Sequence, residues 1–438
     1  MLWFGELKKT FTECLELPLG LPTRPGVALT GDLIANLIAF REFGKETREL
    51  VVRATGLDGR PLEARAFVNE FWTARQRQAS SLHEVSYRAC FKPQLPRFFI
   101  ERLTRPGERV YDPFMGRGTT PIEAALLGRR PAGCDVNPLS VVLTRPRLHP
   151  PVLAEIEARL RQIHLHDPDD LPEDLLVFYH PETLRAISSL KKYLRLKRER
   201  GTTDPVDDWI TCLALNRLTG HSPGFFSVYT MPPNQAVSVK SQRKINERRK
   251  QVPPKREVVK ILLKKSRQLL GDVGEEARET LRRVASEAIL LTGPAEATPQ
   301  IPSGSVSLVV TSPPFLNVVD YATDNWLRCW FLGLDAKAVE LTVPRKLEDW
   351  QAAMTRVLKE LARVLKPGGH VAFEVGEVWK GELKLEEAVL ACGVAAGLTP
   401  LLVLINDQEF TKTANCWGVD NMSKGTNTNR VVVFRKAK

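Results

Sequence analysis

The feature that most constrains the fold is a strand, a glycine-rich turn, a helix and a second strand that follow one another within residues 95–150. The four segments read ERVYDPF, MGRG, TTPIEAALLG and RPAGCDV. This order is typical of a βαβ unit, whose two strands lie parallel in one sheet. Open sheets of this kind bind ligands at the carboxyl ends of their strands. We therefore expect an α/β fold with a ligand at the MGRG turn.

The rest of the chain divides into segments with different patterns. Residues 1–75 mix amphipathic stretches with Gly/Pro turns and indicate no role. Residues 151–294 read mainly as charged amphipathic helices, and SVSLVVTSPPF, HVAFEV and NRVVVFRK again resemble buried strands. We therefore expect one α/β domain made of residues 76–150 and 295–438, with residues 151–294 inserted into it as a helical domain.

Positive charge is concentrated in the expected insertion. The chain has a formal net charge of +12, and residues 240–267 contain twelve Lys and Arg against two Glu. A polyanion such as DNA is the partner that this run favours, although a solvated helix face is the alternative. The residues that we expect to contact phosphates are Lys240, Arg243, Lys244, Arg248, Arg249 and Lys250.

Composition argues against several other classes of protein. The seven cysteines are scattered and form no CxxC pair, and the histidines show no HExxH or other ligand spacing, so we expect neither a disulfide framework nor a metal. No apolar run is long enough to cross a bilayer, and charged residues come too early for a secretory signal. The expected location is the cytoplasm, away from membranes.

Two acidic residues flank the glycine-rich turn. Asp112 ends the first strand, Gly116 and Gly118 let the backbone approach a ligand, and Asp135 ends the next strand. A carboxylate at the position of Asp135 can bind two ribose hydroxyls. The turn lacks the GKS or GKT of a phosphate-binding loop, and Asp112 would repel a pyrophosphate. The ligand should therefore be cationic near Asp112.

A second turn follows the apolar strand SVSLVV and reads Thr-Ser-Pro-Pro-Phe over residues 311–315. The Ser312 hydroxyl and the Pro313 carbonyl could accept the two N–H bonds of an exocyclic amine, which would localise the lone pair of its nitrogen. Phe315 offers a face on which an extruded base could stack. The turn itself contains no carboxylate, so we expect the proton of the amine to leave to water. Taken alone, the two prolines fit an ordinary loop better than a catalytic turn.

Together the two turns resemble those of the DNA amino-methyltransferases, which read DPFxGxGTT and [D/N/S]PP[Y/F]. This chain has DPFMGRGTT and TSPPF, and FKP before the helix QLPRFFIERL resembles the segment that precedes the first turn. The resemblance covers residues 80–145 and 300–438. In this arrangement the helical segment between the turns has the position of the family's target-recognition region.

The resemblance implies a Rossmann-like sheet that binds S-adenosylmethionine and methylates an exocyclic amine in DNA. Serine at the first position of the second turn accompanies cytosine N4 methylation in this family, so N4 of cytosine is the expected target. The implied catalytic residues are Ser312, Pro313, Pro314 and Phe315. The implied cofactor-binding residues are Phe91, Lys92, Pro93, Asp112, Pro113, Phe114, Gly116, Gly118, Thr119, Thr120, Asp135 and Asn137.

The chain also departs from the family pattern. Arg117 fills a position that is usually small, Phe315 replaces the commoner tyrosine, and Thr292 stands where an acid often contacts the cofactor adenine. Adenine N6 methylation, RNA or protein-glutamine methylation and an inactive DNA-binding module are the alternative functions. A partner restriction or defence protein would fit the family, but the sequence indicates neither such a partner nor a recognition site or an oligomeric state. The Gly/Pro/aromatic segment at residues 219–235 fits a DNA-contacting loop or a packed loop equally well.

Overall fold

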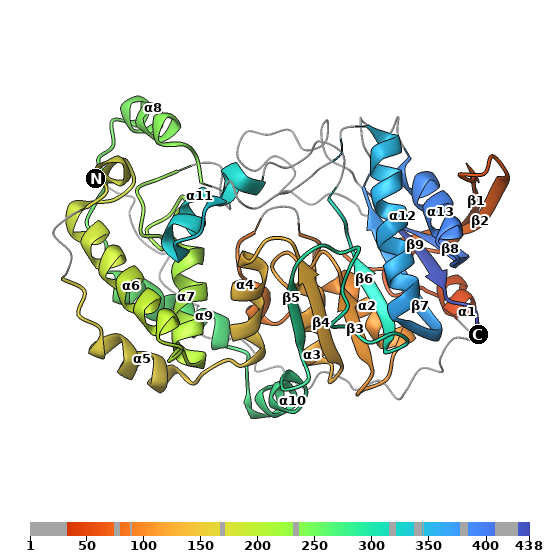
Figure 1. Ribbon diagram of the computed structural model, residues 1–438, viewed down its shortest axis with the longest axis horizontal. Helices are drawn as coiled ribbons and strands as arrows, with labels where there is room; N and C mark the ends of the chain where they lie inside the picture. The colour runs from red at the N-terminus through yellow and green to blue at the C-terminus, as the bar shows by residue number, and fades with distance from the viewer. Residues whose placement is uncertain are drawn as a thin grey trace, which may run out of the picture.

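The computed structural model describes residues 33–73, 79–87, 90–166, 171–230, 236–314, 321–336, 344, 346–376, 384–407 and 428–438. Their strands form one nine-stranded sheet in the order β1-β2-β8-β9-β7-β6-β3-β4-β5, which runs through the right half of Figure 1. The strands are β1 (Arg48–Thr55), β2 (Pro61–Asn69), β3 (Arg109–Asp112), β4 (Arg130–Asp135), β5 (Ile289–Thr292), β6 (Val306–Thr311), β7 (Leu365–Val375), β8 (Thr399–Asp407) and β9 (Thr428–Arg435).

The central strands are parallel, and the side of β3 on which successive strands are added changes once along the chain. From β3 the chain adds β4 and β5 on one side, whereas β6 and β7 lie on the other side of β3. β9 is antiparallel to both β7 and β8. All six residues of β6 are buried, which explains why this strand reads as a continuous apolar run. The boundary between β3 and β6 is a topological switch point, where open α/β sheets bind ligands.

Helices cover both faces of the sheet. On one face, α12 (Leu347–Val364) and α13 (Leu385–Ala395) pack through Trp350, Leu358 and Val389. On the opposite face, α1 (Leu33–Ile38) and α2 (Gln94–Leu103) pack through Leu37, Phe99 and other apolar residues. The predicted α/β class is confirmed. No helix in the described part of the chain is long and apolar enough to span a membrane.

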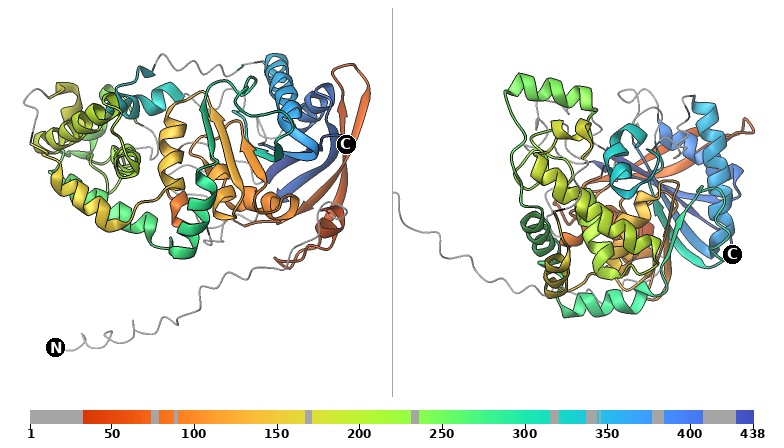
Figure 2. Two further views of the ribbon diagram at one scale, coloured as in Figure 1. Left: turned by 60° about the horizontal axis from the view of Figure 1, so that its bottom comes forward. Right: turned by 60° about the vertical axis from the view of Figure 1, so that its left-hand side comes forward.

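A group of helices stands at the β5 end of the sheet, on the left of Figure 1, and the two views of Figure 2 also place it there. Its members share one apolar core with α3 (Thr119–Leu126) and α4 (Leu139–Leu148). We call this group the helical block. It comprises α5 (Leu153–Gln162), α6 (Pro181–Glu199), α7 (Pro205–Arg217), α8 (Val239–Arg249), α9 (Val258–Leu270) and α11 (Tyr321–Leu332).

The boundaries of this block differ from those expected from the sequence. The expected insertion ran to residue 294, but Ile289–Thr292 form β5, which pairs with β4, and α10 (Glu275–Ala285) packs against α3 and β4. A four-residue strand after a helix gives too short a pattern to separate from the helix before it. Conversely, α11 follows the second turn and still joins the block, where the Trp326 indole donates to the Val237 carbonyl over 3.2 Å.

Two strands within residues 1–75, the region to which the sequence assigned no role, extend the sheet. β1 and β2 form an antiparallel hairpin with a turn at residues 56–60, and β2 pairs in parallel with β8. The Asn406 side chain accepts hydrogen bonds from the backbone N–H groups of Phe71 and Trp72 at 2.7 and 3.1 Å. This buried amide fixes the chain as it leaves the sheet.

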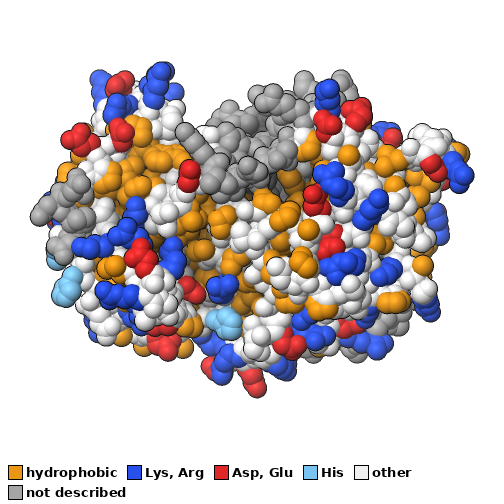
Figure 3. Space-filling model, in the orientation of Figure 1, with side chains coloured by type: hydrophobic (Ala, Val, Ile, Leu, Met, Phe, Trp, Pro, Cys, Tyr) orange, Lys and Arg blue, Asp and Glu red, His pale blue; other side chains and the backbone are white. Residues whose placement is uncertain are grey.

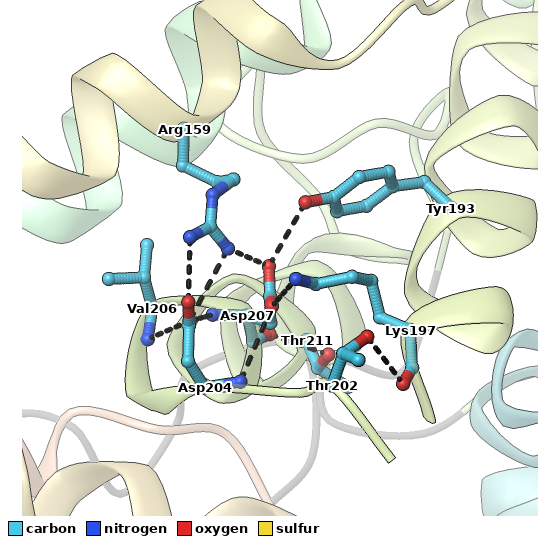
Figure 4. Close-up of polar contacts among 8 residues, drawn as sticks. All are labelled: Arg159, Tyr193, Lys197, Thr202, Asp204, Val206, Asp207 and Thr211. Atoms are coloured by element: carbon cyan, nitrogen blue, oxygen red, sulfur yellow. Dashed lines mark hydrogen bonds and ion pairs between the residues drawn. The ribbon is translucent and has the colours of Figure 1, made fainter. Parts of the chain in front are cut away.

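A partly buried ion-pair network joins three helices of the block, as Figure 4 shows. Asp204 caps α7 by accepting from the N–H groups of Val206 and Asp207, and it also pairs with Arg159 of α5 at 2.6 Å. The fully buried Asp207 contacts Arg159 and lies 3.4 Å from Lys197 of α6. The negative charges of Asp204 at the N-cap and Asp207 in the first turn also interact favourably with the positive N-terminal end of the α7 dipole.

Candidate active site

The two sequence motifs meet at the switch point of the sheet. Asp112 is the last residue of β3, and Thr311 is the last residue of the neighbouring β6, directly before Ser312. The Thr311 hydroxyl donates to Asp112 Oδ1 over 2.6 Å, and both residues are buried. This bond joins the glycine-rich turn to the Ser-Pro-Pro turn, although 199 residues separate them in the sequence.

Asp112 is a buried carboxylate with an unused oxygen. Oδ1 also accepts from the N–H of Phe114 at 3.0 Å, whereas Oδ2 is buried and accepts no hydrogen bond from the described part of the chain. Burial raises the pKa of Asp112 to about 7, against the opposing effect of these hydrogen bonds. A cationic group beside Oδ2 would offset the cost of burying the carboxylate.

The glycines of the turn serve two different purposes. Gly116 has a φ of 49°, and its N–H donates to Asp135 Oδ2 over 2.8 Å. Gly118 has a φ of 80°, and a Cβ on it would lie 2.2 Å from the Thr144 hydroxyl oxygen of α4. Any side chain at Gly118 would therefore clash within the protein, so this glycine is needed for the packing of α3 against α4.

Asp135 ends β4 beside the turn, as expected. Besides Gly116, the N–H of Asn137 donates to its Oδ1 over 2.9 Å, and burial still raises the pKa of Asp135. Each carboxylate oxygen retains a lone pair for a further donor. Thr292 is paired with Asp135 across β4 and β5 and is exposed at the same edge of the sheet.

The segment before α2 lies against the turn. Burial raises the pKa of the Cys90 thiol, which contacts the backbone of Arg117. Lys92 and Pro93 follow at the start of α2, with Lys92 exposed and Pro93 buried as the N-cap. Cys90, directly before residues 91–93, therefore lies beside the glycine-rich turn, and the cofactor-binding role of Phe91, Lys92 and Pro93 stays a prediction. Pro113, Thr119 and Thr120 lie within the turn or at the start of α3, where the Thr120 hydroxyl donates to the Val310 carbonyl of β6 at 3.1 Å.

The Ser-Pro-Pro turn is held by two side chains that the sequence did not single out. The Ser312 side chain hydrogen-bonds the carboxylate of Glu374, a buried residue of the neighbouring strand β7. The amide of Asn429 donates to Glu374 Oε1 over 3.0 Å. The indole N–H of Trp350 in α12 donates to the Pro314 carbonyl over 3.0 Å. Phe315 lies outside the described residues.

Glu374 of β7 adds a carboxylate beside the Ser-Pro-Pro turn, which itself contains none. Burial raises its pKa, against the hydrogen bonds from Ser312 and Asn429. Its sequence context, HVAFEV, reads as a buried strand, and an acid at the end of such a strand is the signal that could have identified it. The pairing of β6 with β7, which sequence periodicity does not predict, brings it to Ser312.

The six basic residues expected to bind DNA lie on α8 or directly after it, and all are exposed. In Figure 3, Lys and Arg side chains lie at the outer end of the block, over α8, next to acidic neighbours. Arg243 pairs with Asp174 at 3.2 Å, and the Arg249 guanidinium lies 3.7 Å from the centre of the Tyr229 ring. The basic run is not one solvated face, because Lys265 is buried.

In the described part of the chain, no group of three or more His, Cys, Asp or Glu side chains is arranged to hold a metal ion. Among the described cysteines, Cys134, Cys212, Cys329 and Cys392 are free thiols. Of the segment at residues 219–235, residues 231–235 lie outside the described residues, and Phe226 packs in the core of the helical block.

Comparison with known proteins agrees with the motifs. The model of a family described as DNA methylase (N6_N4_Mtase) matches residues 1–142. A Type II methyltransferase of Geobacillus stearothermophilus, M.BsoBI, is 23% identical over 348 residues, which cover 71% of this chain and 63% of that protein. The chain is thus similar to a family of DNA methylases over residues 1–142 and to a Type II methyltransferase over most of its length.

Other curated relatives match over shorter stretches. M.MvaI, a Type II methyltransferase of Kocuria varians, is 31% identical over 113 residues, which cover 25% of this chain and 24% of the relative. Among solved structures, a TehB-like SAM-dependent methyltransferase of Corynebacterium glutamicum is 10% identical, with 78% of this chain and 87% of that one covered. Its TM-score is 0.29. The chain spans 63% of the length of M.BsoBI and less of the other relatives.

Proposed function

We propose that this chain is an S-adenosylmethionine-dependent DNA methyltransferase that modifies the exocyclic N4 amine of cytosine. The observation that carries the proposal is the 2.6 Å hydrogen bond between Thr311 and Asp112, which joins the cofactor turn to the Ser-Pro-Pro turn at the switch point. A bound cofactor at Asp112 and a base at Ser312 would then be neighbours.

The residues at the turn fit S-adenosylmethionine. The unused, buried Oδ2 of Asp112 suits the ammonium group, and the remaining lone pairs of Asp135 suit the ribose hydroxyls. Phe91, Lys92 and Pro93 would flank the methionine end, and Thr292 at the end of β5 would face the adenine. When bound, the cofactor supplies an electrophilic methyl group.

The chain's own residues would prepare the amine. Because a hydroxyl has a single proton, a Ser312 side chain that donates to Glu374 presents its oxygen lone pairs to the base as an acceptor. The Pro313 carbonyl would accept the second N–H, and Phe315 would stack on the ring. Glu374, whose pKa is raised by burial, is suited to receive the amine's proton through the Ser312 oxygen. This route replaces release of the proton to water.

The choice of cytosine rests on Ser312, because a serine in this position resembles the cytosine-N4 members of the family. Expression of the full chain in a host without DNA methylation, followed by nucleoside mass spectrometry, tests it. We expect N4-methylcytosine in the DNA of cells with the wild-type chain and none with Ser312→Ala. If the product is N6-methyladenine, the target base is adenine and not cytosine. If methyl groups are found only in RNA, the proposal that DNA is the substrate is wrong.

A further inference from the structure

A basic cavity lies between the glycine-rich turn and the helical block. It has a volume of about 400 Å³ and is lined by Glu84, Val85, Ser86, Tyr87, Arg117, Arg217, Lys265 and Gln268. Arg117 comes from the turn, Arg217 from the end of α7, and Lys265 and Gln268 from α9. The cavity therefore joins the part of the molecule that would hold the cofactor to the part that carries the excess positive charge.

The cations of the cavity outnumber its acids. Arg117, Arg217 and Lys265 face one carboxylate, Glu84, so the described lining has a net charge of +2. The Lys265 side chain is only 6% exposed, and its nitrogen lies 3.8 Å from Glu84 and 3.0 Å from the amide oxygen of Gln268. Glu84 is 51% exposed, so water screens its charge. Buried positive charge of this kind is costly unless an anion offsets it.

The pKa values of the lining groups are consistent with this deficit of negative charge. Burial, followed by the charge of Arg217, lowers the pKa of Lys265 to about 8. Burial, followed by the charge of Arg328, lowers the pKa of Arg217 to about 10. An anion in the cavity would reverse both effects, because it favours the charged forms.

The hydrogen bonds of the cations fix their positions around the cavity. Arg117 donates to the Val85 carbonyl at 2.9 Å and to the Thr119 hydroxyl at 3.2 Å. Arg217 donates to the carbonyl and side-chain oxygens of Asn216 at 2.9 and 2.8 Å, and its guanidinium lies 4.1 Å from the centre of the Phe225 ring. The planar groups are thus oriented before any ligand arrives.

The cavity also touches the expected cofactor site. Tyr87 lines it, and a ring carbon of Tyr87 lies 3.6 Å from the position that a Cβ on Gly116 would take. The Asn137 amide donates to the Tyr87 hydroxyl over 3.3 Å. A negatively charged group in the cavity would therefore lie close to the turn and to Arg117, which lines the cavity.

We propose that this cavity binds a phosphate group of the DNA strand that presents its base to the active site. The proposal rests on the proposed function, because it takes DNA as the substrate. A phosphodiester carries one negative charge and offers several oxygens to the guanidinium and ammonium groups. It would hold the strand between the turn and the helical block.

Lys265→Met in the full-length chain tests the proposal, because it removes the charge and keeps the apolar stem. Binding of a fluorescent random-sequence duplex is measured at several salt concentrations, with Lys359→Gln, an exposed site on α12, as a control for the same change in net charge. We expect Lys265→Met to weaken DNA binding about five- to tenfold and to lower the salt slope by about 1, and the control to change neither. Glu84→Gln should tighten binding, because it raises the charge of the cavity.

Thermal unfolding separates a binding role from a structural one. Lys265→Met should not lower the midpoint of the free protein, because it removes a poorly compensated buried charge. Inorganic phosphate should raise the wild-type midpoint more than that of Lys265→Met. If Lys265→Met binds DNA as tightly as the wild type, the proposal is wrong. If, in addition, inorganic phosphate still raises the unfolding midpoint of the wild type more than that of Lys265→Met, the cavity is a site for free phosphate instead. If the wild type bound no duplex, the proposed function itself would fail.

Discussion

Thr311 and Asp112 share a 2.6 Å hydrogen bond at the point where β6 and β3 end side by side. Thr311, the donor, directly precedes Ser312, and Asp112, the acceptor, is the last residue of β3 at the expected cofactor site. A change at Thr311 should therefore affect cofactor binding more than binding of the base. Thr311→Val removes the donor with little change in shape, and Thr311→Ser retains it. We expect Thr311→Val to bind S-adenosylmethionine about tenfold more weakly by calorimetry, because a hydrogen bond to a charged group is worth about 1.5 kcal/mol. If the two variants bind S-adenosylmethionine with equal affinity, the Thr311 hydroxyl does not contribute to the cofactor site.

The raised pKa of Asp112, about 7, predicts how cofactor binding responds to pH. The carboxylate form is the one that binds a cation, so affinity should fall as the pH is lowered through 7. Asp112→Asn should bind weakly and without this dependence, which titration calorimetry at pH 6 and pH 8 would measure. A wild-type affinity that stays constant over this range would contradict the assignment of Asp112 to the ammonium group.

The same pKa has a consequence for the stability of the free protein. Because the folded-state pKa of Asp112 lies above its unfolded value of 3.8, the folded state binds the proton more tightly between these limits. The stability that Asp112 contributes is therefore greatest near pH 4 and is lost as the pH rises to 7. The difference in unfolding free energy between the wild type and Asp112→Asn, measured in urea, should change in this direction. A difference independent of pH would show that the carboxyl group titrates normally.

Glu374 should influence turnover through Ser312. Glu374→Gln cannot receive a proton, so we expect kcat to fall about 100-fold, a size typical of a lost general base, while cofactor affinity stays within a factor of two to three. The acidic limb of the wild-type kcat profile should lie above the usual range of a glutamate and should be absent in the variant. If Glu374 acts through Ser312, the double variant with Ser312→Ala should be no slower than Ser312→Ala alone. Fully additive losses would give Glu374 a separate role.

The exposed cations of α8 offer a test of the DNA face that does not involve the cavity. Changing Lys240, Lys244 and Arg248 to glutamine should lower the slope of log affinity against log salt by about 0.9 for each phosphate that is no longer neutralised. Cofactor affinity should not change, because α8 is remote from the sheet in Figure 1. Fluorescence anisotropy with a random duplex measures the slope, and an unaltered value would mean that these side chains are only solvated.

The sequence predicted those parts of the molecule that depend on local patterns. The βαβ unit and the turn at Asp112 follow from periodicity and glycine placement, and the structure confirms that both belong to a largely parallel sheet. The approach of Asp112 to Ser312 could be expected only from the resemblance, because strand order is set by tertiary packing. The same reason explains why Glu374 was not foreseen as a partner of Ser312, since β7 reaches it from 62 residues along the chain.

Other differences arise where a short or mixed pattern has two interpretations. Charge counting makes residues 240–267 a single basic run, yet Lys265 lies on the buried side of α9 because its helical neighbours Ile261 and Leu269 are core residues. A count of charges does not show which side of a helix each residue faces, whereas the spacing of the apolar residues in α9 does. α11 joins the helical block through Leu327 and Phe331, which no sequence boundary indicates.

The network around Asp207 in Figure 4 predicts how the helical block responds to removal of a charge. Arg159 is the ion-pair partner of both Asp204 and the fully buried Asp207. Arg159→Met leaves a buried carboxylate with only Lys197, 3.4 Å away, as a cationic partner among the residues described. We expect a decrease of about 3 kcal/mol in unfolding free energy in urea, because removing one partner of a buried ion pair costs about that much.

A control on the same helix separates this effect from a general change in charge. Arg161→Met removes an exposed side chain whose pair with Glu157 spans 3.9 Å, so it should cost about 0.5 kcal/mol or less. Adding Asp207→Asn to Arg159→Met should recover part of the missing stability, because the neutral amide no longer needs a cation. If Arg159→Met and Arg161→Met were equally stable, the Arg159–Asp207 pair would contribute no more than a surface ion pair, and the helical block would owe its rigidity to its apolar core alone.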